Sequence, residues 1–359
     1  MPKKLKKDLI YEYILVFIEQ NKYNSIKKVP SENYLCSRYM VSRETVRAAI
    51  NQLREEGILY SIKGSGTYFK SNEIDNEIIN SNCKYRIATI IQGQDKFAND
   101  QFIKGLKAEI ENKNIELRIF YTDNKFSQER ECLLACSKGF DGIIIDGVKA
   151  SLMNPNLDIY QKIEQKDIRC IFYNNYYPET NFPKIIIDDK GCADLLVHQL
   201  VEEGHKDIAG IFYCDNYQGT EKYRGFIHSL LKHNISIKDD NLKWLISDNI
   251  NEEKEFQRII NRFLSTNKSS AIICCNFMIL KHIQHKIKNL KKLACFDYSR
   301  DDWEKENILC SLSPSYEVGK KVGKNMANML DDSNFKIHDY SYIFKPIIYY
   351  PQKTDHYIN

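Results

Sequence analysis

The sequence predicts an α/β protein in which parallel sheets form a large two-lobed domain, preceded by a small domain of three helices and a β-hairpin. Three observations carry this prediction. From residue 85 onward, apolar strands alternate with helix-like stretches. Before residue 71, apolar residues at helical spacing define short helices. Between these regions, residues 72–84 contain no aromatic residue and are rich in Asn and Glu, which is typical of a linker.

The first domain, residues 1–71, has clear helix boundaries. A first helix over residues 8–20 carries Ile10, Ile14 and Ile18 on one face. Ser31 and Ser42 are good N-caps for a second and a third helix. The third helix is expected to bury one apolar face and to end at Gly57. The β-prone residues 58–62 and 67–69 then predict a hairpin with a small, glycine-containing tip.

Charge separates the two domains. Residues 1–71 carry 13 Lys and Arg against 7 Asp and Glu, whereas the rest of the chain carries 39 against 41. The positive excess is therefore N-terminal, as expected of a small nucleic-acid-binding domain attached to a neutral partner domain.

Arg43 and Arg47 stand four residues apart near the start of the third helix. A recognition helix enters the major groove by its N-terminal end, where Arg can donate two hydrogen bonds to guanine O6 and N7. The glycines of the hairpin tip would let a wing approach the DNA backbone or the minor groove. The N-terminal domain is therefore predicted to be a winged helix-turn-helix that binds DNA.

The stretch VPSENYLCSRYMVSRETVRAAINQLREEGIL and the wing KGSGTYF resemble the gluconate-repressor (GntR) family. Asn33 departs from some relatives, which carry a DNA-contacting Arg at this position, so operator preference there stays open. The candidate DNA-binding residues implied by this resemblance are Ser31, Glu32, Ser42, Arg43, Thr45, Arg47, Lys63, Gly64, Ser65 and Gly66.

The second domain, residues 85–359, is expected to consist of two halves. Predicted strands cover residues 87–91, 115–121, 142–145 and 168–173 in the first half, and 208–212, 244–246, 271–274 and 293–296 in the second. Two doubly wound halves would leave a cleft at the carboxyl ends of their strands, which is where open α/β sheets bind ligands.

The stretches IDDKGCADLLVHQLVEEGHKDIAGIF, QGTEKYRGF, AIICCN and ACFDYS resemble the effector half of the lactose-repressor family, which shares its fold with periplasmic sugar-binding proteins. With the N-terminal domain and the stretches VKASLMNPN and FYNNYY, the chain is similar to the family of arabinose-responsive repressors from low-GC Gram-positive bacteria. This resemblance implies a repressor that a small sugar, L-arabinose first, releases from its operator.

A sugar cleft needs charged or amide groups that pair with hydroxyls, together with apolar faces. Each candidate has a plainer alternative, since Asp297 or Asn174 can cap a loop and Lys149 can be solvated. Arg224 is included because it lies next to a matched position. The candidate effector-binding residues are Asp95, Lys149, Asn174, Gln218, Lys222, Arg224, Asn276 and Asp297.

The ligand remains open at this stage. Phe277 stands where sugar-binding relatives commonly have an acidic residue, and Lys222 stands where many have an Arg. The region 281–292 is also shorter than usual. A different pentose, a sugar phosphate paired with Lys222, Arg224 or Lys149, or a non-sugar ligand would accommodate these differences, and a corepressor is a further alternative.

Other classes of protein are less compatible with the sequence. We find no nucleotide-binding glycine loop, no nucleophile elbow and no HExxH motif, so we expect no enzyme and no cofactor. His282 and His285 lack the further ligands of a metal site, and the eleven cysteines are expected to be free thiols. A solute-binding transport protein is a remote alternative, because the basic N-terminus lacks the features of a secretion signal.

The expected partners follow from this architecture. Regulators with one recognition helix per chain usually bind palindromic operator DNA as homodimers. No apolar run approaches the ~20 residues of a membrane helix. We therefore expect a cytoplasmic homodimer that binds operator DNA and a small-molecule effector.

Overall fold

The computed structural model describes residues 6–21, 28–62, 66–69, 83–93, 95–251, 253–287, 291–298 and 308–350. The chain divides into two compact units, Met1–Ser81 and Asn82–Asn359. Residues 72–82 of the predicted linker lie outside the described residues. We refer to the first unit as the head and to the second as the effector domain, and each is described by itself.

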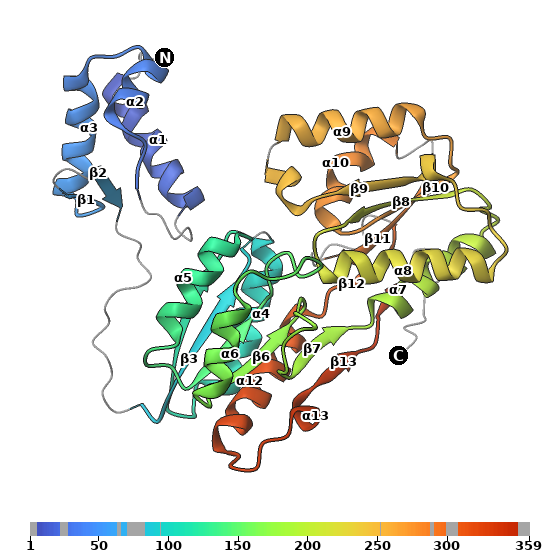
Figure 1. Ribbon diagram of the computed structural model, residues 1–359. Coiled ribbons are helices and arrows are strands. Elements are labelled where there is room, and N and C mark those ends of the chain that lie inside the picture. The colour runs from blue at the N-terminus through green and yellow to red at the C-terminus, as the bar shows by residue number, and fades with distance from the viewer. Residues whose placement is uncertain are drawn as a thin grey trace. The chain divides into compact units, whose positions relative to one another are not determined.

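The head contains the predicted helices and hairpin (Figure 1). Its elements are α1 (Lys6–Asn21), α2 (Glu32–Tyr39), α3 (Arg43–Glu55), β1 (Leu59–Ile62) and β2 (Gly66–Phe69). The predicted face of α3, formed by Val46, Ala49, Ile50 and Leu53, is buried. It packs in one apolar core with residues of α1, α2 and both strands. Helical periodicity of the apolar residues therefore correctly predicted this fold.

The first lobe of the effector domain is a six-stranded parallel sheet of order β13-β7-β6-β5-β3-β4. Its strands are β3 (Tyr85–Ile91), β4 (Ile115–Tyr121), β5 (Gly142–Ile145), β6 (Arg169–Tyr173), β7 (Lys184–Ile187) and β13 (Tyr342–Phe344). Its helices are α4 (Lys96–Ile110), α5 (Phe126–Cys136), α6 (Leu157–Gln165), α12 (Ser315–Asp331) and α13 (Ile337–Tyr340).

The second lobe has a six-stranded sheet of order β14-β12-β11-β10-β8-β9, parallel except for the β12–β14 pair. Its strands are β8 (Ile208–Tyr213), β9 (Leu242–Leu245), β10 (Ala271–Cys274), β11 (Lys292–Tyr298), β12 (Leu309–Leu312) and β14 (Ile348–Tyr349). Its helices are α7 (Asp189–Glu202), α8 (Tyr217–Lys232), η1 (Asp239–Asn241), η2 (Ser247–Asn251), α9 (Glu253–Thr266) and α10 (Phe277–Ile287).

The eight predicted strands of the effector domain are all present, whereas β7, β12, β13 and β14 were not predicted. Of these unpredicted strands, β13 and β14 have three and two residues, too few for a periodic pattern. β7 and β12 have four residues, as do the predicted β5, β9 and β10, so length alone does not explain why they were missed. They include the segments at which the chain passes between the lobes. After β12 the chain returns to the first lobe as α12, and β13 and β14 then lie in different sheets.

Helix α12 packs very closely on α4. A Cβ atom added at Gly105 would lie 2.0 Å from the carbonyl oxygen of Tyr316, and one at Gly319 would lie 2.1 Å from that of Phe102. Glycine is therefore required for these two backbones to approach each other. β12 belongs to the second lobe and leads directly into α12. The contact between α12 and α4 therefore anchors this connection between the lobes to the first lobe.

Candidate DNA-binding and effector sites

The two arginines of the predicted recognition helix are exposed and held by side chains of α2. Nη2 of Arg43 donates to Oδ1 of Asn33 at 2.9 Å. Nε of Arg47 lies 3.2 and 3.0 Å from the two carboxylate oxygens of Glu32. Glu32 is thus placed beside a predicted base-reading side chain, and Asn33 contacts the other. These contacts restrict the arginine rotamers before any DNA is bound.

Ser31 and Ser42 cap the two helices of this motif. The hydroxyl oxygen of Ser31 accepts from the Tyr34 amide, and that of Ser42 accepts from the Thr45 amide at 3.3 Å. The Ser42 and Thr45 hydroxyls lie 3.0 Å apart. The polar residues at the start of α3 are therefore gathered at its N-terminus, which also carries a positive partial charge that favours a phosphate.

Of the predicted wing residues, Gly66 is described, whereas Lys63, Gly64 and Ser65 lie outside the described residues. Gly66 has a φ of +137°, which only glycine adopts readily. A Cβ atom there would lie 2.5 Å from Cε of Lys28. Glycine thus permits both the turn into β2 and the close approach of a basic side chain.

In the first lobe, three candidate effector residues lie at the carboxyl edge of the sheet. Asp95 follows β3 and accepts from the Ala98 amide at 3.1 Å, so it is the N-cap of α4. Asn174 follows β6 with a φ of 55°. Lys149 follows β5 with a φ of 44°. Ligand binding in open α/β folds takes place at this edge.

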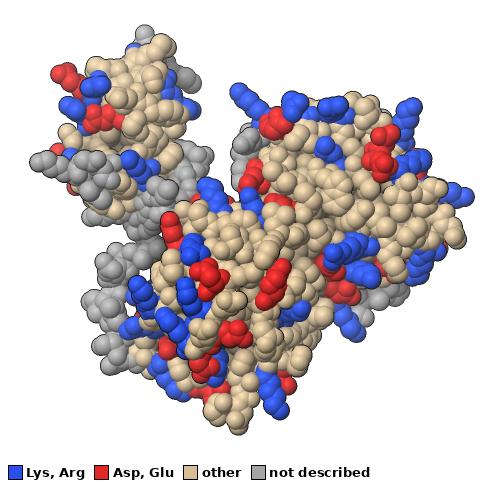
Figure 2. Space-filling model, in the orientation of Figure 1, with Lys and Arg blue, Asp and Glu red and all other residues tan. Residues whose placement is uncertain are grey.

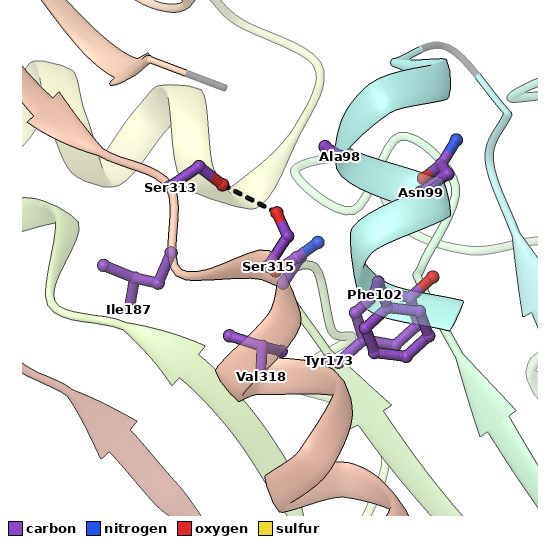
Figure 3. A pocket seen from close by; sticks show the side chains of 9 residues that line it. Ala98, Asn99, Phe102, Tyr173, Ile187, Ser313, Ser315 and Val318 are labelled. Atoms are coloured by element: carbon purple, nitrogen blue, oxygen red, sulfur yellow. Dashed lines mark hydrogen bonds between the residues drawn. The ribbon is translucent and has the colours of Figure 1, made fainter. Parts of the chain in front are cut away.

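A small pocket opens at the same edge (Figure 3). Asn174 is the candidate residue that lines it. The rings of Phe102 and Tyr173 are stacked with centroids 4.0 Å apart, and the hydroxyls of Ser313 and Ser315 lie 2.8 Å apart. The pocket thus combines two aromatic side chains of the core with small polar groups. Its complete lining is Ala98, Asn99, Phe102, Tyr173, Asn174, Ile187, Ser313, Ser315 and Val318.

In the second lobe, Lys222 is the centre of a buried charge cluster. Its Nζ pairs with Oδ2 of Asp297, lies 3.7 Å from Oδ1 of Asp189 and lies 3.4 Å from the carbonyl oxygen of Cys275. Neither carboxylate oxygen of Asp189 has a hydrogen-bond partner among the described residues. The structure therefore brings together two of the predicted residues, Lys222 and Asp297, and adds a third group that was not predicted.

The burial of this cluster shifts its pKa values. Burial disfavours the ammonium of Lys222, but the carboxylates of Asp297 and Asp189 outweigh that effect and hold its pKa well above the usual value. Burial raises the pKa of Asp189, and the charge of Lys222 partly offsets the increase. Lys222 is therefore charged at neutral pH and lies between Asp297 and Asp189. Of these two carboxyl groups, Asp189 resists ionisation.

The remaining candidates are placed differently. Asn276 accepts from the Ile279 amide at 3.0 Å at the start of α10, and Phe277 packs edge-on against Tyr298. The backbone amide of Gln218 donates to Asn175. Arg224 has a side chain that is 67% exposed and pairs with Glu221 one helical turn away. Arg224 therefore lies on the outer face of α8, apart from the cluster around Lys222.

Hydrogen bonds join the two lobes beside these residues. Nζ of Lys149 lies 2.7 Å from Oδ2 of Asp248, and Nδ2 of Asn124 donates to the Ser247 hydroxyl at 2.5 Å. The Ser151 and Thr220 hydroxyls lie 3.2 Å apart. These contacts between polar side chains thus hold the carboxyl edges of the two sheets against each other. Of the candidates, Lys149 and Gln218 take part in this closure.

Sequence reasoning missed several groups of the site. Asp189 lies in the quoted stretch IDDKGC, where the doubled Asp was a usable signal. Ser313 and Ser315 follow the unpredicted strand β12, so their position at the carboxyl edge was not visible. Asp248 lies in a short 3-10 helix that has no sequence pattern.

Family comparisons agree with this geometry. Residues 6–69 match the model for bacterial regulatory proteins of the gntR family. Residues 87–280, more than half of the chain, match that for periplasmic binding proteins and the sugar binding domain of the LacI family. The chain belongs to this LacI-type sugar-binding family. Its head is of the gntR family, so both predicted resemblances are confirmed, as is the fold class.

Two relatives that the chain matches over more than two thirds of its length are named as repressors. The chain is 29% identical over 252 residues to an arabinose metabolism transcriptional repressor of Halalkalibacterium halodurans, covering 69% of this chain and 67% of the relative. It is 27% identical over 278 residues to the arabinose metabolism transcriptional repressor of Geobacillus stearothermophilus, covering 77% and 74%.

Two solved structures have a similar fold over about three quarters of the chain. The transcription regulator CcpA of Lactococcus lactis aligns with a TM-score of 0.61 at 14% identity, covering 74% of this chain and 97% of that one. An ABC transporter solute binding protein from Bacillus halodurans aligns with a TM-score of 0.65 at 12% identity, covering 75% and 96%. Among the described residues, we find no helix with the length and apolar character needed to cross a membrane.

Proposed function

We propose that this protein is a cytoplasmic transcription repressor whose head binds operator DNA and whose effector domain binds a sugar, L-arabinose first, that releases the DNA. The observation that carries this proposal is the joining of a gntR head to a LacI-type sugar-binding domain in one chain. Similarity to two arabinose metabolism repressors over most of the chain supports the choice of sugar. The protein acts by binding and not by catalysis.

In this proposal the head binds DNA through the N-terminal end of α3. Arg43 and Arg47 read guanines of a half-site, while Ser42, Thr45 and the wing, including Lys63, contact the backbone. Two copies of the chain form a homodimer on a palindromic operator, because a single recognition helix reads too few base pairs for specific binding. The contacts of Arg43 with Asn33 and of Arg47 with Glu32 support the proposal, because they orient both arginine side chains of α3.

The charges of the effector domain favour a neutral ligand over a sugar phosphate. The cations considered for an anionic ligand already have carboxylate partners: Lys149 has Asp248, Lys222 has Asp297, and Arg224 has Glu221. Asp189 adds a second acid beside Lys222. Figure 2 also shows acidic and basic side chains interspersed over the face of this domain in view. A dianionic phosphate would therefore have to displace existing ion pairs, whereas hydroxyl groups can bond to them.

Release of DNA by the sugar follows from linkage. If the operator and the sugar favour different arrangements of the dimer, each weakens binding of the other by the same factor. The hydrogen bonds between the lobes provide an element that a ligand in the cleft would rearrange. A ligand that instead tightens operator binding would make the protein a corepressor-dependent regulator.

Calorimetry and thermal unfolding of the full chain with a panel of sugars test the effector. The panel contains L-arabinose, other pentoses, hexoses, and the phosphate esters of the pentoses. A ligand at 100 times its dissociation constant stabilises the native state by about 2.7 kcal/mol. We expect this effect from L-arabinose and none from the phosphates. If only a phosphate ester or another pentose stabilises the protein, that compound replaces L-arabinose as the proposed effector. The assignment as a transcription regulator would stand.

A further inference from the structure

Glu129 of α5 is a buried carboxylate outside the candidate effector site. It has 0% exposure and accepts hydrogen bonds from four side chains. Asn154 and Asn156 donate to Oε2 at 2.7 and 2.9 Å. The hydroxyls of Tyr160 and Tyr177 donate to Oε1 at 3.1 and 2.5 Å. Both carboxylate oxygens are therefore fully used, which is the condition under which a buried charge is tolerated.

Three of the four donors come from two loops that follow neighbouring strands, and the fourth, Tyr160, lies in α6. Residues 146–156 follow β5 and supply Asn154 and Asn156, and residues 174–183 follow β6 and supply Tyr177. The two stretches whose resemblance to arabinose-responsive repressors the sequence suggested, VKASLMNPN and FYNNYY, lie in these loops or at their borders. Asn154 and Asn156 of the first stretch and Tyr177 of the second converge on one carboxylate, which gives the two stretches a shared physical function.

The network fixes the backbone immediately before Lys149. The amide of Val148 lies 3.5 Å from Oε1 of Glu129, and its carbonyl oxygen lies 2.8 Å from the Tyr177 hydroxyl. The Lys149 amide donates to Oδ1 of Asn124 at 3.3 Å. Lys149 itself has a φ of 44°, a left-handed conformation that a lysine adopts only under constraint. Glu129 and its partners supply that constraint.

The constrained segment makes the contacts to the second lobe. Lys149 pairs with Asp248 at 2.7 Å, and the Ser151 amide donates to the carbonyl oxygen of Asp215 at 3.3 Å. The Ser151 hydroxyl lies 3.2 Å from that of Thr220. A path of direct contacts thus connects Glu129 through residues 148–151 to the surface that the two lobes share.

We propose that Glu129 is a positioning residue that sets the response to the effector by holding residues 148–151 in the form that bridges the lobes. The inference rests on the proposed function, since it concerns the response of the same domain. Glu129 does not touch the ligand. It acts through Lys149 and Ser151, whose contacts differ between the arrangements that bind sugar and DNA.

Glu129→Gln tests this in the full chain with little change in volume. With its NH2 group toward Asn154 and Asn156, the glutamine would set donors against donors. With its NH2 group toward the tyrosines it can donate to both hydroxyls, but the Tyr160 hydroxyl then loses its acceptor, so the network is weakened in either orientation. The matched control is Glu116→Gln. Glu116 is a carboxylate of the same lobe, paired with Arg86 and Arg118 near the amino end of β4. Tyr177→Phe is a milder second variant should Glu129→Gln fail to fold.

Two measurements are made on each variant, namely hydrogen exchange of residues 147–153 without ligand, and the L-arabinose concentration that releases half of a bound operator. In Glu129→Gln we expect exchange to accelerate at least tenfold and the required concentration to change at least tenfold. Operator affinity without sugar should stay within twofold. Tyr177→Phe should shift both quantities in the same direction, and Glu116→Gln should shift neither.

Unchanged exchange, or faster exchange with an unchanged sugar response, would overturn the positioning role. A wild-type protein that binds its operator but ignores L-arabinose would instead refute the effector assignment. In that case the exchange measurement still decides whether Glu129 holds residues 148–151.

Discussion

Nε of Arg47 in the recognition helix lies 3.0 Å from Oε2 of Glu32 in the preceding helix. The pair is exposed, so its contribution to stability is small. Its consequence is geometric, because the contact orients the guanidinium of Arg47, and a contact with Asn33 orients that of Arg43. Preorganised side chains lose less conformational entropy when they bind.

Arg47→Ala should weaken binding to operator DNA by about 1 to 3 kcal/mol, because a bidentate contact to guanine is lost. Fluorescence anisotropy with labelled DNA, selected from a random pool by the purified protein, measures the change. Arg54→Ala is the control, since Arg54 lies in the last turn of the same helix and away from its N-terminus. Equal losses for both variants would show a general electrostatic effect and remove Arg47 from the base-reading residues.

Lys222→Met should destabilise the effector domain by about 3 to 5 kcal/mol, because it leaves Asp297 and the buried Asp189 without their cation. Adding Asp297→Asn to this variant should restore part of the loss. Urea unfolding measures both. Lys232→Met provides the control on the same helix, where the Lys232 side chain is 57% exposed and its pairing with Asp194 contributes little. If Lys222→Met lowers the free energy of unfolding by less than about 1 kcal/mol, the claim that Lys222 neutralises two acidic groups in a buried cluster would be wrong.

The free energy of unfolding of Asp146→Asn should increase relative to that of the wild type as pH rises from 5 to 7. Burial raises the pKa of Asp146 to about 7, and hydrogen bonds from Asn175 reduce the shift. The unfolded chain therefore releases this proton at lower pH than the folded chain does. The free energy of unfolding falls with pH in this window, by at most about 1.4 kcal/mol per pH unit.

Comparing urea unfolding of wild type and Asp146→Asn at several pH values isolates the contribution of Asp146 to the pH dependence of the unfolding free energy. Asp158→Asn is the control, because its pKa is lowered by the hydrogen bond from Arg130 and it is ionised throughout the window. A constant difference between wild type and Asp146→Asn from pH 5 to 7 would show that Asp146 ionises normally in the folded state.

Gly319→Ala should destabilise the protein by about 1 to 3 kcal/mol, although alanine favours helices. The new methyl group would meet the backbone carbonyl of Phe102, so α12 would have to move away from α4. Lys324→Ala, at an exposed position of α12, should change the unfolding free energy by less than about 0.5 kcal/mol. Thermal and urea unfolding distinguish the two results, and a neutral Gly319→Ala would mean that the helices can separate freely.

The head could be predicted from sequence almost completely, because its helices have strong periodicity and clear caps. Ser42 and the buried face of α3 illustrate this. The lobes could be predicted from long apolar strands such as Ile115–Tyr121, while short strands such as β13 left no readable pattern.

The candidate effector site was only partly predictable. Matched positions led to Lys222 and Asp297, which the fold places in contact. Glu129 lies at a helical position where a sequence cannot distinguish a solvated carboxylate from a buried one, and the doubled Asp188-Asp189 was a signal that did not show which of the two is buried. Arg224 was considered because it lies close to Lys222 in the sequence, but residues two positions apart on a helix point about 200° apart, and its side chain lies on the outer face.

The most direct test of the central claim is a titration of sugar into the preformed complex of the full-length protein with its selected operator, followed by fluorescence anisotropy. The account predicts that L-arabinose releases the DNA in a saturable manner, while phosphate esters of pentoses at the same concentration do not. An operator complex that resists every neutral sugar but dissociates with a sugar phosphate, or tightens when L-arabinose binds, would contradict it.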